Sequence, residues 1–159
     1  MISACLLGVC CRYDGEHSRS DKVVDFAASV SFIPFCPEQL GGLPTPRPPA
    51  NMVGGDGPDI LAGRGRLINE QGEDVTRAFL KGAREALKLA RLTGALAAVT
   101  KDKSPSCGLH TPYCDKPSGM GVTAALFASQ GIRVFEMGRD DPFPNDAFWG
   151  FLNKLMPKE

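Results

Sequence analysis

The chain has 159 residues, which is enough for one domain with a buried core. Eighteen Lys and Arg balance eighteen Asp and Glu, so the overall charge does not favour a nucleic-acid-binding protein. No apolar stretch approaches the roughly 18 residues that cross a membrane, and no basic segment precedes the apolar N-terminus. We therefore expect one cytoplasmic domain over residues 1–159, present as a monomer or a homodimer.

The first half of the chain predicts short elements joined by loops. In chain order they are a buried strand at 1–7, a short helix at 22–29, a strand at 30–35 and a small hairpin at 60–70. Pro34 weakens the second strand, because proline has no backbone N–H to donate. The segment 41–58 holds five prolines and five glycines, so we expect it to lack regular structure and to form a long functional loop.

The second half of the chain has the clearer pattern. It predicts a helix at 75–93, a buried strand at 95–100, a helix at 122–128, a strand at 132–135 and a C-terminal helix at 146–155. The helix at 75–93 has Asp74 as its expected N-cap and Gly94 as its expected C-cap. Strands alternating with helices indicate an α/β fold with a mostly parallel, Rossmann-like sheet flanked by helices. A second Pro/Gly-rich loop is expected at 101–120.

Three cysteines follow predicted strands. Cys5 lies near the end of the first strand, Cys36 directly follows the second, and Cys107 lies in the loop after the strand at 95–100. Ligands of such sheets bind outside the carboxyl ends of the strands, so these thiols are expected to meet on one face. Thiolates select zinc, copper(I) or iron–sulfur clusters, and three of them leave one metal position open. Isolated cysteines are also common as buried packing residues, and spacing alone does not decide between the two interpretations.

The other cysteines have weaker signals. Cys10 and Cys11 are adjacent, and a packed pair near the site is the favoured interpretation, with a fourth ligand or a redox partner as the alternative. Cys114 lies in the loop at 101–120, and we assign it no role.

Polar residues beside the cysteines suggest acid–base chemistry. Glu38 follows Cys36 by two positions and could act as a general acid or base, or it could simply occupy the first turn of a short helix that begins at Pro37. Ser104 could bind substrate or relay a proton, or form an ordinary Ser-Pro turn. Arg47, in the proline-rich segment, would point toward an anionic group of a ligand.

Five motifs in the same order resemble one family. They are Ser3-Ala4-Cys5-Leu6-Leu7-Gly8, Arg12-Tyr13-Asp14-Gly15, Cys36-Pro37-Glu38 with the following Gly41–Pro48 segment, Lys103-Ser104-Pro105-Ser106-Cys107-Gly108, and Gly121-Val122-Thr123-Ala124-Ala125-Leu126. They resemble the bacterial thiouracil desulfurase family, and the match runs from about residue 2 to residue 137 at similar spacing.

The resemblance implies a [4Fe-4S] cluster held by Cys5, Cys36 and Cys107, with one iron free for the sulfur of a thiolated pyrimidine. The substrate would be 2-thiouracil or 4-thiouridine 5'-monophosphate, and water would replace the sulfur without net redox change. Sulfide would be released, with Glu38 and Ser104 as the acid/base and proton-relay pair. The partner implied is a small molecule rather than a nucleic acid.

Substrate contacts and rival ligands complete the expectations. The candidate substrate-binding residues are Arg12, Arg47, Lys101 and Ser106, of which the three cations would bind a nucleotide phosphate. Cys11, directly before the Arg-Tyr-Asp-Gly motif, is the rival cluster ligand. Asn51 stands where the family pattern leads us to expect an acidic residue.

Three other classes of protein stay open. One is a non-catalytic zinc protein in which Cys11 closes a tetrahedral site. Another is a thiol redox protein that works through Cys10 and Cys11 or through Cys5. The last is a nucleotide-binding regulator without chemistry.

Overall fold

A four-stranded parallel sheet forms the centre of the molecule. The computed structural model describes residues 1–110 and 118–155, and within them the sheet has the order β2-β1-β5-β6. Its strands are β1 (Ile2–Ser3), β2 (Pro34–Phe35), β5 (Ala97–Lys101) and β6 (Arg133–Met137). All three pairings are parallel. The predicted α/β fold with a mostly parallel sheet is therefore confirmed.

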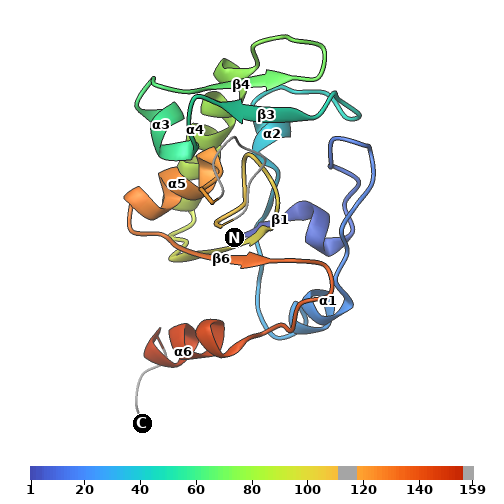
Figure 1. Cartoon of the computed structure of the whole chain (residues 1–159). Coiled ribbons are helices and arrows are strands. Elements are labelled where there is room, and N and C mark those ends of the chain that lie inside the picture. Colours follow the sequence, from blue (N-terminus) through green and yellow to red (C-terminus); the bar gives the residue numbers. More distant parts are fainter. Residues whose placement is uncertain (111–117, 156–159) are drawn as a thin grey trace.

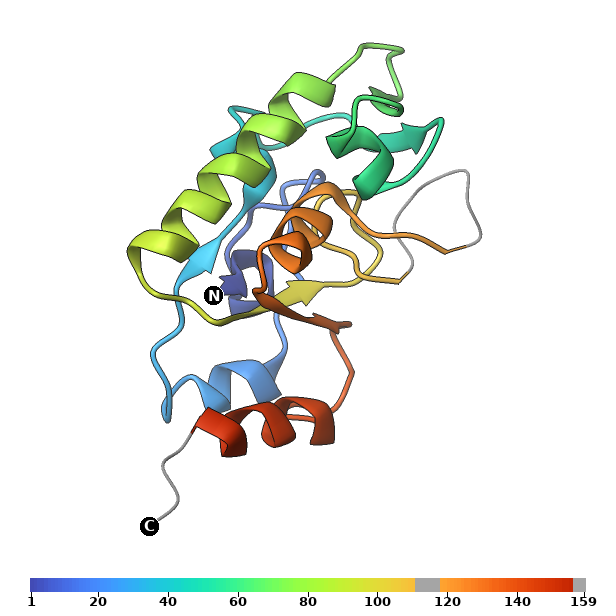
Figure 2. The same ribbon diagram turned by 90° about the vertical axis from the view of Figure 1, so that its left-hand side faces the viewer.

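Helices cover both faces of this sheet (Figures 1 and 2). The helices are α1 (Asp21–Phe26), α2 (Pro37–Leu40), α3 (Gly57–Leu61), α4 (Thr76–Leu92), α5 (Val122–Ser129) and α6 (Asp146–Leu155). On one face α4 and α5 pack around Phe127 and Ala98, and on the other α1 and α6 pack around Val99 and Phe148. Adjacent residues of β5 therefore serve opposite cores, as side chains alternate along a strand. None of the helices in the described ranges has the length and apolarity needed to cross a membrane.

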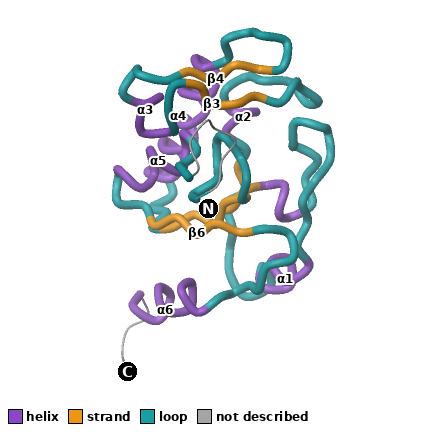
Figure 3. Tube along the Cα trace, in the orientation of Figure 1, coloured by secondary structure: helices purple, strands orange, loops and turns teal. Residues whose placement is uncertain are grey.

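A small two-stranded antiparallel sheet lies apart from the main sheet, beyond α4 and α2 (Figure 1). It pairs β3 (Ala50–Val53) with β4 (Arg66–Asn69), and Met52 and Leu67 pack with Phe79 of α4 in a third core. Loops occupy much of the space between this two-stranded sheet and the main sheet, as the teal segments of Figure 3 show.

Two predictions in this region were wrong. The segment 41–58 contains β3 and the start of α3, and the hairpin predicted at 60–70 does not form, because β4 pairs with β3 instead. Residues 57–61 become helical because Pro58 lies at the first turn and the side chains of Asp56 and Asp59 form a capping box. Prolines and glycines thus mark the ends of short helices and strands here rather than preventing them.

Several predicted boundaries also differ. The strand predicted at 1–7 ends at Ser3, where a 3₁₀ turn over Ala4–Leu7 begins and closes at the left-handed Gly8. The strand predicted at 30–35 is reduced to Pro34–Phe35. The N-cap of α4 is Val75 rather than Asp74, although the Asp74 carboxylate accepts the Thr76 N–H at 2.9 Å. The five elements predicted in the second half of the chain all form, with ends shifted by one or two residues.

Candidate active site

Four thiols line one cavity at the carboxyl ends of the parallel strands. They belong to Cys5, Cys11, Cys36 and Cys107, and the cavity has a volume of about 450 Å³. The two-stranded sheet contributes to its wall through Ala50 and Asn51 of β3 and through Glu70, which directly follows β4. The prediction that three separated cysteines meet on one face is confirmed by this cavity, and Cys11 joins them. Cys10 is exposed and does not line it, and Cys114 lies outside the described residues.

Cys5, Cys36 and Cys107 are each positioned by the segment that follows a strand. Cys5 lies in the 3₁₀ turn after β1, and Cys36 occupies the N-cap position of α2 directly after β2. Cys107 lies in a tight turn after β5, where the Ser104 hydroxyl oxygen accepts the Cys107 N–H at 3.1 Å. Gly121 packs so closely against this turn that a Cβ there would lie 2.8 Å from the Cys107 nitrogen. The turn is thereby fixed by its own hydrogen bonds and by the start of α5.

Three of the four thiols are buried and Cys36 is half-buried, and this burial changes their acidity. Burial and the neighbouring Cys36 raise the pKa of the Cys107 thiol. A hydrogen bond with Cys11 and burial raise the pKa of Cys36. For Cys11, a hydrogen bond with Cys36 lowers the pKa, but a hydrogen bond with Cys5 together with burial raises it to about 11. The thiols of Cys11, Cys36 and Cys107 are therefore neutral at pH 7, and a thiophilic cation would be needed to hold them as thiolates.

Glu38 lies in the first turn of α2 and lines the same cavity. Its Oε2 accepts a hydrogen bond from Nε of Arg47 at 2.6 Å, and its Oε1 accepts one from the Ser106 hydroxyl at 3.2 Å. Glu38 therefore occupies the first turn of a short helix, as predicted, and it also lines the cavity. The ion pair with Arg47 fixes the orientation of this carboxylate.

Arg47 is tied to the protein rather than left for a ligand. Its side chain is 4% exposed. Besides Glu38, its guanidinium donates to the carbonyl oxygens of Pro44 and Cys11 at 3.1 and 3.0 Å. The chemistry predicted for Arg47 was the recognition of an anion, and the anion it contacts is the carboxylate of Glu38.

The other predicted substrate-binding residues differ in their surroundings. Arg12 and Lys101 line the cavity, but Arg12 pairs with Asp14 at 2.7 Å and Lys101 pairs with Asp102. Ser106 is buried and does not line the cavity, and it acts instead as a hydrogen-bond donor to Glu38.

Some cavity residues were not among the predicted catalytic, ligand or substrate-binding residues. They are Tyr13, Glu70, Asp102 and Lys103. Tyr13, Asp102 and Lys103 adjoin residues that were predicted, and their neighbourhood could have indicated them. Glu70 had no such signal, because it reaches the cavity only through the pairing of β3 with β4.

The donor set fits a cluster better than a single ion. In residues 1–110 and 118–155, no group of three or more His, Cys, Asp or Glu side chains is arranged to hold one metal ion. A zinc ion needs its sulfur ligands about 2.3 Å from one point, whereas an iron–sulfur cluster offers separate irons to separate thiolates. Soft thiol donors spread around one cavity therefore suit an iron–sulfur cluster.

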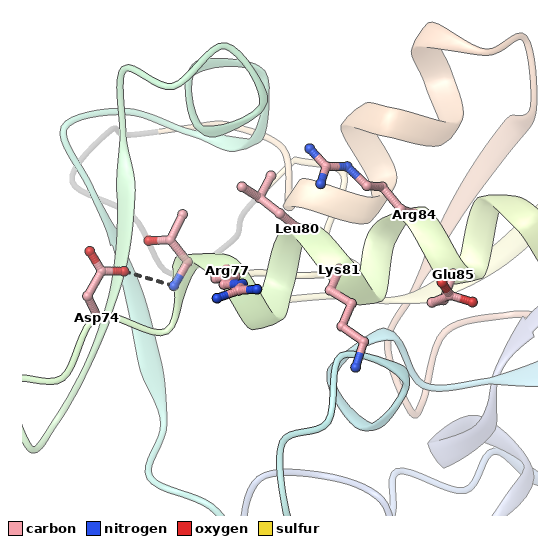
Figure 4. Close-up of a pocket in the computed structure, with 7 residues that line it drawn as sticks. Asp74, Arg77, Leu80, Lys81, Arg84 and Glu85 are labelled. Carbon is pink, nitrogen blue, oxygen red and sulfur yellow. Dashed lines mark hydrogen bonds between the residues drawn. The ribbon is translucent and has the colours of Figure 1, made fainter.

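A second, more open hollow of about 640 Å³ runs along α4 (Figure 4). Its lining includes Arg77, Leu80, Lys81 and Arg84, which follow one another along the exposed side of the helix. It contains no thiol, and its Asp74 already accepts a hydrogen bond from Thr76. We therefore assign the candidate active site to the smaller cavity, where the thiols and Glu38 meet.

Fold and site together define an α/β protein whose thiols gather, with one carboxylate, at the carboxyl edge of a parallel sheet. A model of the family described as 2-thiouracil desulfurase matches residues 1–138. The chain therefore belongs to the 2-thiouracil desulfurase family, which confirms the resemblance drawn from its motifs.

Two relatives support this assignment. The protein named "Uncharacterized protein YbbK" from Bacillus subtilis (strain 168) is 41% identical over 139 residues, which are 84% of this chain and 92% of YbbK. A solved structure of the [4Fe-4S]-dependent thiouracil desulfidase TudS is 37% identical, with a TM-score of 0.75 over 95% of this chain and 96% of that chain.

Proposed function

We propose that this chain is a desulfidase that replaces the sulfur of a thiolated pyrimidine by oxygen and uses a [4Fe-4S] cluster to do so. The observation that carries the proposal is the meeting of Cys5, Cys36, Cys107 and Glu38 in one cavity, from segments far apart in the chain. The similarity to TudS supports the choice of cofactor and of substrate class. The reaction consumes one water and releases hydrogen sulfide, with no net transfer of electrons.

When bound, the cluster supplies a thiophilic Lewis acid for the departing sulfur. Glu38 accepts a proton from the attacking water, because hydrogen bonds from Arg47 and Ser106 orient its carboxylate at the cavity wall. The Ser104 oxygen accepts two backbone N–H groups, from Ser106 at 3.2 Å and Cys107 at 3.1 Å. Its hydroxyl also forms a hydrogen bond with the Cys107 thiol, and we assign to the same hydroxyl the donation of a proton toward the substrate.

We assign the cluster ligands to Cys5, Cys36 and Cys107, and Cys11 to a supporting role. The Cys11 carbonyl oxygen accepts hydrogen bonds from the Arg47 guanidinium and, at 3.7 Å, from the Cys36 thiol. Cys11 thus links the ligand segment to the Glu38–Arg47 pair through its backbone, which a change of side chain would leave in place.

The test is anaerobic reconstitution followed by iron and acid-labile sulfide counts, with sulfide release from 2-thiouracil and 4-thiouridine 5'-monophosphate measured on the same sample. We expect about four irons per chain and sulfide release that depends on the cluster. Cys107→Ser should lose both, whereas Cys10→Ser, at an exposed thiol outside the cavity, is the matched control and should keep both. Cys11→Ser tests whether Cys11 is a ligand. It should retain iron if the ligands are Cys5, Cys36 and Cys107, as proposed.

Glu38→Gln tests the chemistry separately from the cofactor. We expect it to bind iron normally and to lose sulfide release by a factor of about 10² to 10⁴, the range for a general acid–base. A single tightly bound zinc with no acid-labile sulfide in the wild-type protein would contradict the proposal and leave the structural zinc site.

A further inference from the structure

Four cationic residues line the candidate active site, and three of them form ion pairs with carboxylates of the protein. Arg12 pairs with Asp14, Arg47 with Glu38, and Lys101 with Asp102. The fourth cation is Lys103, which is exposed. Within the described part of the chain Lys103 has no hydrogen bond or ion pair, so its charge is left for a group that enters the cavity.

The backbone of Lys103 has an unusual conformation. Its φ is +49°, and no other non-glycine residue in the described ranges has a positive φ. This left-handed conformation is unfavourable for a residue with a Cβ, and such outliers persist where neighbouring structure enforces them. Here the Asp102 N–H donates to the Met137 carbonyl at 3.0 Å, and Ser104 anchors the turn that carries Cys107. Lys103 is thus fixed between two anchored residues at the cavity wall.

From these two observations we propose that Lys103 binds an anionic group of the substrate and so determines which thiolated pyrimidines are accepted. The anionic group is either the phosphate of a nucleotide or the ionised ring of a free thiolated base. A lysine without a protein partner binds such a group mainly by charge, with a contribution from an N–H···O hydrogen bond. The inference rests on the proposed function for the identity of the substrate, but not for the presence of an anion site.

Glu70 provides a control of opposite charge. Glu70 directly follows β4 and lines the same cavity, and no other side chain in the described ranges pairs with its carboxylate. Removing this negative charge should leave the binding of an anion unchanged or strengthen it. Removing the positive charge of Lys103 should weaken it.

The experiment measures binding and turnover with the reconstituted protein. Lys103→Asn removes the charge while keeping a residue that tolerates positive φ, and Lys103→Arg restores the charge. Calorimetry measures the affinity for uridine 5'-monophosphate and for uridine, and steady-state kinetics give the KM for 4-thiouridine 5'-monophosphate and for 2-thiouracil. Each measurement is made on the wild type, on both Lys103 variants and on Glu70→Gln.

If Lys103 binds the phosphate, Lys103→Asn lowers the affinity for uridine 5'-monophosphate about tenfold and leaves the affinity for uridine unchanged. Lys103→Arg then recovers the affinity for the nucleotide. If the ionised ring is bound, the KM for 2-thiouracil rises by a similar factor, and rises more above the ionisation pH of the ring. The wild-type affinity should also fall with salt, and that of Lys103→Asn should fall less. Equal values for wild type and Lys103→Asn in all these measurements would overturn the inference. A wild-type protein that binds the nucleotide through Lys103 but releases no sulfide would instead refute the proposed function.

Discussion

Replacing Arg47 by Met tests the buried network that holds Glu38. Removing one partner of a buried ion pair costs about 3–5 kcal/mol, because the other charge is left unpaired. Arg47 is 4% exposed and Glu38 is 15% exposed, so water reaches the carboxylate from the cavity and reduces the cost. We expect Arg47→Met to lower the free energy of unfolding by about 3 kcal/mol, which corresponds to a Tm lower by roughly 6–12 °C.

The assay is urea denaturation of the cluster-free protein, followed by far-UV circular dichroism. In the double variant Arg47→Met/Glu38→Gln the unpaired charge is gone, so at least about 1 kcal/mol of the loss should return. Arg64→Met is the surface control, because Arg64 pairs with Asp59 but is 64% exposed, and it should cost less than about 1 kcal/mol. A loss below about 1 kcal/mol in Arg47→Met, or no recovery in the double variant, would refute the role given to this pair.

Two further predictions concern α4. A Cβ at Gly82 would lie 1.8 Å from the Pro37 carbonyl oxygen, so Gly82→Ala should destabilise the protein by about 1–2 kcal/mol in thermal denaturation, despite the better helix propensity of alanine. It should also slow turnover, because α2 carries Glu38, and unchanged activity would contradict this account. Hydrogen bonds from Thr76 lower the pKa of Asp74, so the carboxylate stabilises the fold above its unfolded pKa and this contribution is lost as pH falls. Asp74→Ala should therefore cost about 0.5 kcal/mol at pH 7, a small value for an exposed hydrogen bond, and the difference from wild type should shrink as pH falls below the ordinary carboxyl pKa of 3.8. A difference that is independent of pH would argue against the role given to this hydrogen bond.

The elements that the sequence predicts well are those whose pattern is local. In α4 the apolar residues repeat at helical spacing, and β5 is a continuous apolar run between a helix and a polar loop. The strand β3 has no such pattern, because only Met52 of its four residues is buried. Its partner β4 also lies beyond a helix, so the pairing could not be read from neighbouring residues.

The same distinction applies to the site. The convergence of Cys5, Cys36 and Cys107 follows from a general rule, because parallel strands present their carboxyl ends at one edge. The pairing of Arg47 with Glu38 follows from no such rule. It depends on how the proline-rich segment folds back against α2, and this set of tertiary contacts has no signature in composition or spacing.

The wide separation of the proposed ligands along the chain has a consequence for the lifetime of the protein. Cys5, Cys36 and Cys107 are separated by roughly 30 and roughly 70 residues, so one group bound to all three acts as a cross-link that closes two long loops. For disulfides, loops of this length correspond to ~3–5 kcal/mol each, through the restriction of the unfolded chain. Oxidative loss of the cofactor would then release three segments at once and increase the population of unfolded chains open to proteases. Exposure to oxygen would thus limit the persistence of the folded chain as well as its activity.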